Sequence, residues 1–441
     1  MNESRALNPA VLLPYFSQLE SRPTICWRGR VTQVVGNLLE SAGPPCSLGE
    51  CCEVRDAAGH IYAGEVVGFR GTTVLTMPLE KPSGVRYGDP IVAHGERPSV
   101  PVGEELLGRV IDGTGGALDG GPAHGARERR PLDTLAPLAL QRLPIREPLG
   151  CGIRAIDAFL TCGRGQRLGI FGGSGVGKST LIGMMARGTA ADLTVLALVG
   201  ERGREVGEFL EALGPAGRKR SVVVVSTSDQ SPLLRIRAAL AATSIAEYFC
   251  QTGKNVLLVV DSLTRFAMAQ REIGLAAGEP PTAKAYTPSV FSMLARLVER
   301  AGRFASGSIT AFYTVLMEGD DQQDPLVDAL RSLVDGHIML DRRLASESHY
   351  PPIAVLDSLS RLMPAVAARE HSARSSRLRS LLSAYARSED LIRIGAYIPG
   401  SDALLDRAIA VLPQLQEFLC QVPEEQAPLA ETITRLNSLA V

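Results

Sequence analysis

The sequence predicts an α/β protein in three parts: a small N-terminal β-barrel, an α/β core with a parallel sheet, and a C-terminal helical domain. Three patterns favour this order. Between residues 24 and 95, Gly, Pro or Asp interrupts short apolar runs about every 8–12 residues. From about 150 to 345, continuous apolar runs alternate with helical segments. From about 371 onward, Ala, Leu and Arg recur with helical periodicity.

We expect residues 1–23 to form a leader or docking segment. The stretch VLLPYFSQL carries four apolar or aromatic side chains at helix-like spacing, namely Leu12, Tyr15, Phe16 and Leu19. Pro14 limits any helix that would begin before it. A frayed terminus and a docking helix both fit this segment.

Residues 24–95 are expected to form the β-barrel. Their short runs are GRVTQVVGNLLES, ECCEVRD, HIYAGEVVGF and TTVLTMPL, with the spacing of a small all-β barrel or sandwich. The following stretches, GERPSVPVGEE and GTGGALDGGPAHGARERRPLD, are rich in Gly, Pro and charge. They indicate a domain boundary and a long surface connection.

Residues 96–370 are expected to form the α/β core. Its predicted strands are RLGIF, TVLALVG, SVVVVSTS, NVLLVVD, SITAFYTVL and HIMLD. Apolar runs without alternation indicate strands buried on both faces, and the helices between them indicate crossovers of a parallel sheet. Residues 371–441 are expected to form the helical domain, because RSSRLRSLLSAYARSEDLIRI and DALLDRAIAVLPQLQEFLCQV follow helical periodicity.

The composition excludes several function classes. The formal net charge is −1 and hydrophobic residues make up 45% of the 441 residues, so general binding to nucleic acid or anionic lipid is not indicated. No apolar run approaches the roughly 18–20 residues that cross a bilayer, and the start MNESRALNPA lacks a signal pattern. We therefore expect a cytoplasmic protein, with peripheral membrane association left open. The eight cysteines contain no CxxC and no zinc spacing, which predicts reduced thiols.

The stretch GGSGVGKS, Gly172 to Ser179, fits the phosphate-binding pattern G-x-x-x-x-G-K-[ST]. Its glycines allow successive backbone N–H groups to curl around a phosphate, and a helix starting at Ser179 or Thr180 points its dipole at the same charge. Lys178 supplies a positive charge for the β- and γ-phosphates, and the Ser179 hydroxyl is a ligand for Mg²⁺. The predicted nucleotide-binding residues are Gly172, Gly173, Ser174, Gly175, Val176, Gly177, Lys178, Ser179 and Thr180.

Two carboxylates stand at the ends of predicted strands. NVLLVVD ends in Asp261, which we expect to hold Mg²⁺ or its waters; a strand-end cap is the alternative. TVLALVG is followed by Glu201, at the carboxyl edge where open α/β sheets bind ligands. We expect Glu201 to orient the water that attacks the γ-phosphorus; a solvated helix-start glutamate is the alternative.

Taken together, GGSGVGKST, GERGREV, DSLTRFAMAQREI, GSITAFYTVL, GDDQQDP and LDSLSR resemble one family. These motifs are similar to those of the ATPases that energise type III protein export in the virulence injectisome and the bacterial flagellum. That family is related to the catalytic subunit of rotary ATP synthases, which implies a RecA-like P-loop NTPase core. The resemblance covers roughly residues 25–420.

The resemblance also implies roles for single residues. Besides Lys178 and Glu201, it implies catalytic roles for Arg202 near the γ-phosphate, for Arg265 in the site, and for Arg361, which would reach into a neighbouring subunit's site. It further implies that Tyr350 stacks on adenine and that Tyr397 plays a similar part. Two positions depart from the pattern, Ala285 and Thr287, where relatives often carry Gly and Pro.

The implied assembly is a homohexameric ring with ATP and Mg²⁺ at sites between subunits. The family implies that the N-terminal leader meets a stator-like regulatory protein, and that a central stalk protein, the export gate and chaperone–effector complexes are further partners. It also implies peripheral association with the export apparatus at the inner membrane. No nucleic-acid partner is expected.

Other functions fit the sequence less well. A non-catalytic nucleotide-binding subunit would lack the glutamate that stands here as Glu201. The segments TCGRGQRLGIF and LIRIGAYIPG disfavour a rotary ATP synthase catalytic subunit. A nucleic-acid translocase would need a basic barrel, but residues 24–95 hold six Lys or Arg against seven Asp or Glu. LALVGERGREV favours the injectisome, whereas GDDQQDP also fits flagellar relatives.

Overall fold

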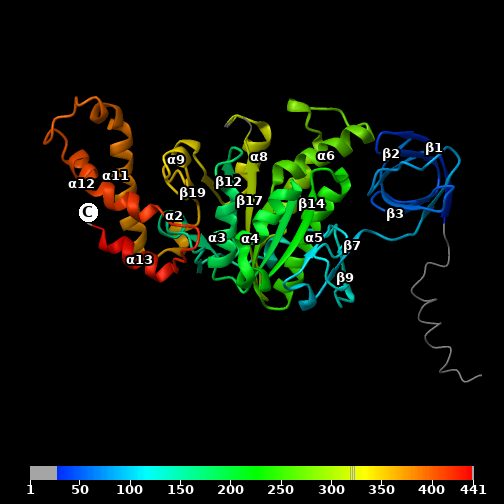
Figure 1. The fold of residues 1–441 in the computed structure, drawn as a ribbon, viewed down its shortest axis with the longest axis horizontal. Helices are drawn as coiled ribbons and strands as arrows, with labels where there is room; N and C mark the ends of the chain where they lie inside the picture. The colour runs from blue at the N-terminus through cyan, green and yellow to red at the C-terminus, as the bar shows by residue number, and fades with distance from the viewer. Residues whose placement is uncertain (1–26, 318, 320, 322, 440–441) are drawn as a thin grey trace, which may run out of the picture. The chain divides into compact units, whose positions relative to one another are not determined.

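The computed structural model describes residues 27–317, 319, 321 and 323–439 (Figure 1). The predicted leader, residues 1–23, lies outside this part of the chain. The described residues form two compact units. One comprises residues 27–98 with Ala276–Gly278, and the other comprises the rest. No helix in the described ranges combines the length and apolar character needed to cross a bilayer.

The first unit is a closed six-stranded barrel, as the sequence predicted. The strands follow one another around it in the order β1-β2-β5-β4-β3-β6, all antiparallel. Their bounds are β1 Trp27–Val35, β2 Leu38–Ala42, β3 Cys51–Arg55, β4 Ile61–Arg70, β5 Thr73–Pro78 and β6 Pro90–Ala93. Alternate side chains of β4 are buried, which is the pattern of a strand with one face in a core. That core contains Val31, Leu39, Val54 and Ile91.

The second unit is built on a largely parallel sheet, which confirms the predicted α/β core. The strand order is β19-β18-β12-β17-β15-β13-β14-β8, and the edge strand β19 runs antiparallel to β18. Bounds are β8 Val110–Ile111, β12 Arg167–Gly172, β13 Leu193–Glu201, β14 Ser221–Thr227, β15 Asn255–Asp261, β17 Ser308–Leu316, β18 Gly336–Met339 and β19 Leu359–Ser360. Short additional strands are β7 Ser99–Val102, β9 Glu128–Pro131, β10 Pro148–Leu149, β11 Cys162–Gly163 and β16 Gly302–Arg303. The central strands are buried along nearly their whole length, as their apolar runs require.

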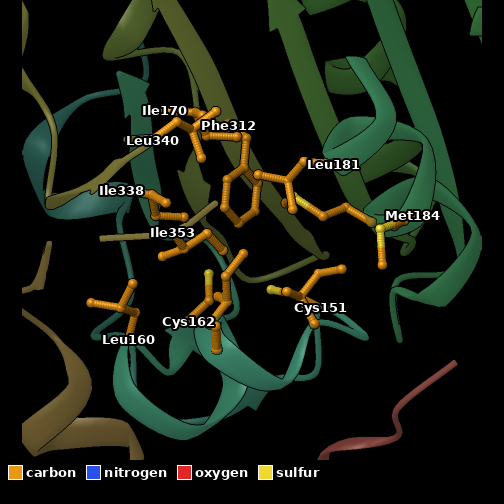
Figure 2. Close-up of a cluster of buried hydrophobic side chains, with 14 of the residues drawn as sticks. Cys151, Leu160, Cys162, Ile170, Leu181, Met184, Phe312, Ile338, Leu340 and Ile353 are labelled. Atoms are coloured by element: carbon orange, nitrogen blue, oxygen red, sulfur yellow. The ribbon is translucent and has the colours of Figure 1, made fainter. Parts of the chain in front are cut away.

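Helices connect and cover these strands. They are α2 Arg154–Phe159, α3 Lys178–Gly188, α4 Gly203–Lys219, α5 Pro232–Gln251, α6 Leu263–Ala277, α7 Pro288–Val298, α8 Pro325–Leu333, α9 Arg342–Ser346 and α10 Met363–Val366. Figure 2 shows the apolar core around α3, where Leu181 lies by Phe312 of the sheet and Met184 belongs to the same cluster. The long helix α5 starts at a favourable cap, because the Ser231 hydroxyl accepts from Leu234 N and Pro232 occupies the first turn.

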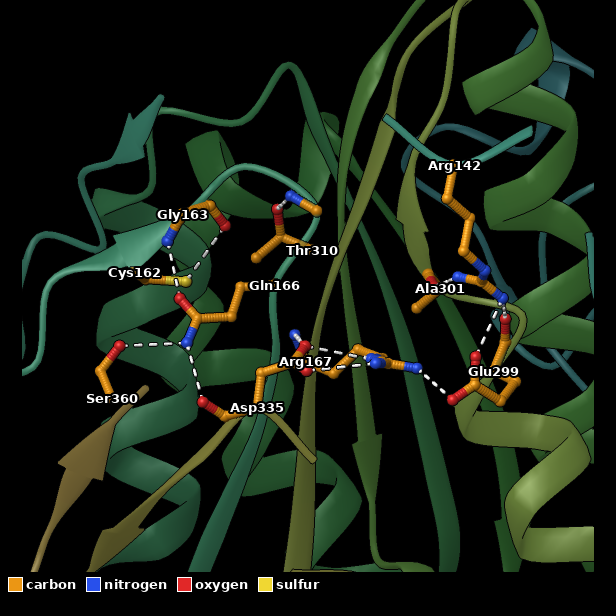
Figure 3. Close-up of polar contacts among 11 residues, drawn as sticks. Arg142, Cys162, Gly163, Gln166, Arg167, Glu299, Ala301, Thr310, Asp335 and Ser360 are labelled. Atoms are coloured by element: carbon orange, nitrogen blue, oxygen red, sulfur yellow. Dashed lines mark hydrogen bonds and ion pairs between the residues drawn. The ribbon is translucent and has the colours of Figure 1, made fainter. Parts of the chain in front are cut away.

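A polar network fixes the amino ends of the central strands (Figure 3). Arg167, at the start of β12, donates from Nε to Asp335 Oδ2 at 3.1 Å and pairs with Glu299 at 2.6 Å. The neighbouring Gln166 donates to the Ser360 hydroxyl at 3.0 Å, which joins β12 to the edge strand β19. These hydrogen bonds therefore connect the amino end of β12 to Asp335, just before β18, and to Ser360 of β19.

The C-terminal helices are α11 Arg369–Arg393, α12 Ala403–Leu419 and α13 Leu429–Ser438, as the helical periodicity predicted. They pack on the core within the same compact unit. Arg154 of α2 joins the two, since its buried guanidinium donates to Phe418 O at 2.7 Å and pairs with Glu425. The Arg154 amide also donates to the Gln421 side chain at 2.9 Å. This network holds the end of α12 beside α2.

Candidate nucleotide-hydrolysis site

The predicted phosphate loop connects β12 to α3. Gly175 and Gly177 have φ values of +78° and +89°, a conformation that glycine adopts without strain. Gly177 is the residue before α3, so its left-handed turn delivers the chain directly into the helix at Lys178, one residue before the predicted start. The unpaired N–H groups of the first helical turn lie at this end of α3. The loop thus has the local geometry of an anion cradle.

Three charged side chains converge beside the loop. Lys178 Nζ lies 2.6 Å from Asp261 Oδ1 and 3.9 Å from Glu201 Oε1. Asp261 ends β15 and Glu201 ends β13, and these strands are neighbours in the sheet. The three side chains are 11%, 2% and 14% exposed, so their charges interact with little screening by water. The sheet therefore brings together the residues that the sequence analysis assigned to one site.

Burial and charge raise the pKa of Glu201 to about 7. Burial is the largest cause, and the negative charge of Asp261 adds to it, while Lys178 acts in the opposite direction. Glu201 Oε1 is buried and has no hydrogen-bond partner among the described residues. A carboxyl group with a pKa near neutral and an oxygen that accepts no hydrogen bond is suited to orient and polarise a water molecule.

Two predicted arginines lie near Glu201. Arg202 follows it directly in the chain, and Arg265 packs against the residue before it. Arg265, on α6, packs against Gly200: a Cβ added at Gly200 would lie 3.1 Å from the Cβ of Arg265. Its buried Nε has no hydrogen-bond partner within the described ranges. The Arg202 side chain is 76% exposed and lies 3.9 Å from Glu205. Arg265 therefore places a buried donor beside the end of β13, whereas the Arg202 side chain is exposed.

Arg361 lies far from the phosphate loop of its own chain. Its backbone N–H donates to Asp335 O at 3.0 Å, and Asp335 is bonded to Arg167 at the amino end of β12. The loop leaves the opposite end of this six-residue strand, roughly 16 Å away at about 3.3 Å per residue. The exposed guanidinium donates to Arg331 O at 3.4 Å. The fold therefore does not bring Arg361 to the phosphate loop of its own chain.

Tyr350 lies on the phosphate loop. Its hydroxyl donates to Gly177 O at 2.9 Å, and burial raises its pKa. Its backbone carbonyl accepts from Gln421 N at 2.7 Å, so the segment after α12 lies beside it. Gln421 could not be predicted from the sequence, because no local pattern signals a contact between residues 71 positions apart. Tyr397 lies between α11 and α12, and its hydroxyl donates to Asp406 Oδ1 of α12 at 2.7 Å.

The residues present fit a divalent metal that arrives with a nucleotide. The described part of the chain contains no cluster of three or more His, Cys, Asp or Glu that could hold a metal. The candidate ligands are the exposed Ser179 hydroxyl at the start of α3 and the Asp261 carboxylate. Two protein oxygens are few for Mg²⁺, which usually completes its shell with phosphate and water. Glu201 Oε1 and Arg265 Nε are buried and make no hydrogen bond within the described ranges, so each could bond to a polar ligand.

The barrel, the parallel sheet and this loop with its two strand-end carboxylates define a P-loop nucleotide hydrolase. Comparison with family models supports this class. Residues 31–95 match the β-barrel domain of the ATP synthase alpha/beta family, and residues 152–360 match its nucleotide-binding domain. Residues 367–438 match the T3SS EscN ATPase C-terminal domain.

Individual relatives narrow the class. The chain is 51% identical to the flagellum-specific ATP synthase of Bacillus subtilis (strain 168), over 93% of this chain and 94% of the relative. It is 48% identical to the type 3 secretion system ATPase of Xanthomonas euvesicatoria, over 93% of each. A solved structure of the assembled ATPase EscN from the enteropathogenic E. coli type III secretion system matches with a TM-score of 0.89 and 43% identity, covering 93% of this chain and 99% of that one. The chain therefore belongs to the ATPases of type III secretion and flagellar export, which confirms the resemblance and the enzyme class.

Proposed function

We propose that this ATPase hydrolyses ATP with Mg²⁺ to energise protein export through a type III apparatus. The observation that carries the proposal is the convergence of Lys178, Asp261 and Glu201 beside the phosphate loop. The work done would be the release of chaperones and the unfolding of substrates at the export gate. Chaperone–effector complexes and the gate are accordingly proposed partners.

In the proposed mechanism, each residue at the loop has one task. Loop amides and Lys178 bind the β- and γ-phosphates. Ser179 and Asp261 would hold Mg²⁺, which when bound neutralises charge on the phosphate oxygens. Lys178 leaves its pairing with Asp261 as it turns to the phosphates. Glu201 orients the attacking water through its unpartnered oxygen, and Arg265 offers a donor to the charge that develops at the γ-phosphate.

Tyr350 is proposed to receive the adenine ring, because it lies over the helix start at Gly177. Tyr397 is the second proposed aromatic contact. Arg202, exposed at the start of α4, is proposed to approach the γ-phosphate when the site is closed. These three assignments follow from the resemblance to the family.

We further propose a homohexameric ring in which Arg361 of one subunit completes the site of the next. The distance from Arg361 to its own loop supports a role in a neighbour's site. An arginine that stabilises the transferred phosphoryl group is worth roughly 10³–10⁵ in rate. Assembly would then switch hydrolysis on, because a lone subunit lacks that arginine.

A central stalk protein, a stator-like regulator and peripheral attachment at the cytoplasmic face of the inner membrane complete the proposed assembly. EscN has been solved in complex with its central stalk EscO, which supports a stalk partner here. The motif LALVGERGREV favours a virulence injectisome, and the flagellar system is the alternative that 51% identity to a flagellar relative supports. Complementation separates them: restored effector secretion in an injectisome ATPase deletion supports the first, and restored motility alone supports the second.

The enzymatic part is tested by paired variants. Lys178→Ala is expected to abolish nucleotide binding, because it removes the cation that grips the phosphates. Glu201→Gln is expected to bind nucleotide and not turn it over. The exposed Glu208→Gln on α4 is the matched control and is expected to behave as the wild type. Turnover by Glu201→Gln near the wild-type rate would remove Glu201 from the mechanism.

A further inference from the structure

The strand between the phosphate loop and Asp261 carries a buried hydroxyl at the same level of the sheet. β17 lies between β12 and β15 in the strand order. Val260 pairs with Tyr313, so the next residues along, Asp261 and Thr314, are level with each other. Thr314 is fully buried. Thr314 lies in the motif GSITAFYTVL, but the resemblance to the family implied no role for it.

The Thr314 hydroxyl is hydrogen-bonded to the Asp261 carboxylate. Thr314 Oγ1 lies 2.7 Å from Asp261 Oδ1 and 3.3 Å from the backbone carbonyl of Val260. A hydroxyl has one proton to donate, and the shorter, charge-assisted bond to the carboxylate is the stronger of the two. The neutral Val260 carbonyl could also have accepted this proton. The buried hydroxyl therefore did not need the Asp261 carboxylate merely to have a hydrogen-bond acceptor.

Asp261 Oδ1 also receives Lys178 Nζ at 2.6 Å, so a single oxygen accepts from both sides. When Lys178 turns to the phosphates of a bound nucleotide, Thr314 is the donor from the described part of the chain that remains on Oδ1. The carboxylate is 2% exposed, and losing every protein donor would leave a buried charge poorly solvated. A donor fixed on β17 avoids this and holds the carboxylate at one rotation about its Cβ–Cγ bond.

We infer that Thr314 is a positioning residue that holds Asp261 for divalent-metal binding, an inference that rests on the proposed function. Residues that orient metal ligands in this way typically change metal affinity by about 10–100-fold when removed. Thr314 acts through Asp261, so its loss is expected to change how nucleotide binding depends on Mg²⁺. Metal-free nucleotide binding, which relies on the loop and Lys178, is not expected to change.

The test compares Thr314→Val with a matched control on the same strand. Val keeps the volume and branching of Thr and removes the hydroxyl. Thr310→Val makes the identical change four residues earlier on the same face, where the buried Thr310 hydroxyl accepts from Gly165 N at 2.8 Å. Thr314→Ser restores the hydroxyl without the methyl group. Circular dichroism and thermal unfolding verify that each variant folds.

The measurement is the binding of a fluorescent ADP, N-methylanthraniloyl-ADP, at increasing Mg²⁺ and separately in EDTA. Thr314→Val is expected to raise the Mg²⁺ concentration for half-maximal binding about 10-fold, with unchanged affinity in EDTA. Thr314→Ser and Thr310→Val are expected to titrate like the wild type. In an Asp261→Asn background, Thr314→Val should add nothing, because the two residues act as one unit.

An unchanged Mg²⁺ midpoint in Thr314→Val would overturn the inference, as would an equal shift in Thr310→Val. If Thr314→Val does not fold, Thr314→Ala makes the same comparison and is judged by the same midpoint. Failure of the proposed function looks different: there, the wild type itself would bind the probe without any dependence on Mg²⁺.

Discussion

Arg361→Ala separates the chemistry of one subunit from the chemistry of a ring. Arg361 is exposed, and among the described residues its guanidinium makes one long hydrogen bond, 3.4 Å to Arg331 O. Removing such a surface side chain is expected to change the free energy of unfolding by about 0.5 kcal/mol or less. If it completes a neighbour's site, its loss lowers turnover by roughly 10³–10⁵. That range corresponds to about 4–7 kcal/mol of activation barrier.

The assay is steady-state ATP hydrolysis on assembled protein, with assembly followed by light scattering. Arg361→Ala is expected to form rings, bind nucleotide and hydrolyse it slowly. Arg393→Ala, which removes another exposed arginine from α11, is the control and is expected to hydrolyse normally. Mixing Arg361→Ala with Lys178→Ala is the decisive step, because some interfaces then join an intact loop to an intact arginine. Part of the activity is expected to return; rings of mixed composition that stay as inactive as the separate variants would refute the reasoning.

Three further changes probe the loop, the catalytic carboxylate and the buried acid of α2. Gly177→Ala is expected to weaken nucleotide binding at least 10-fold. Gly177 has φ +89°, and an added Cβ would lie 2.7 Å from the Tyr350 ring, which strains the loop by about 1–3 kcal/mol. Wild-type affinity in a calorimetric titration would contradict this prediction. Glu201→Gln is expected to lower turnover by two or more orders of magnitude with nucleotide affinity nearly unchanged, and quenched-flow measurement of the first turnover checks that the chemical step is the one lost. Burial raises the pKa of Asp157 from 3.8 to about 7. At pH values between these two, the folded state keeps a proton that the unfolded state has released. The free energy of unfolding is therefore expected to fall as pH rises from about 4 to 7. Asp157→Asn is expected to flatten that slope in urea unfolding; an unaltered slope would show that the carboxyl is ionised in the folded protein throughout.

The phosphate loop and its two carboxylates could be predicted because each has a local signature. The glycines and Lys178 occupy fixed spacings, and Asp261 and Glu201 directly follow runs of buried apolar residues. Once the sheet is parallel, the carboxyl ends of its strands meet at one edge, so the convergence follows from topology. The barrel was predictable for a similar reason, since its turns recur at short intervals.

Contacts between segments distant in sequence could not be predicted. Thr314 reads as one more β-branched residue in a strand, and only the strand order places its hydroxyl on Asp261. Gln421 meets Tyr350, and Arg154 meets the end of α12, through tertiary packing that leaves no periodic trace in the chain. The position of Arg361 at the amino end of the sheet likewise emerges only from the fold. Long-range polar contacts were therefore the part that required a structure.

The most direct measurement is isothermal titration of the full-length protein with ADP in the presence and absence of Mg²⁺, beside Lys178→Ala. We expect saturable binding heat for the wild type, with an affinity that increases when Mg²⁺ is present, and no saturable heat for Lys178→Ala. Binding of equal affinity by Lys178→Ala, or no heat from the wild type at millimolar nucleotide, would contradict the claim that this loop grips the phosphates.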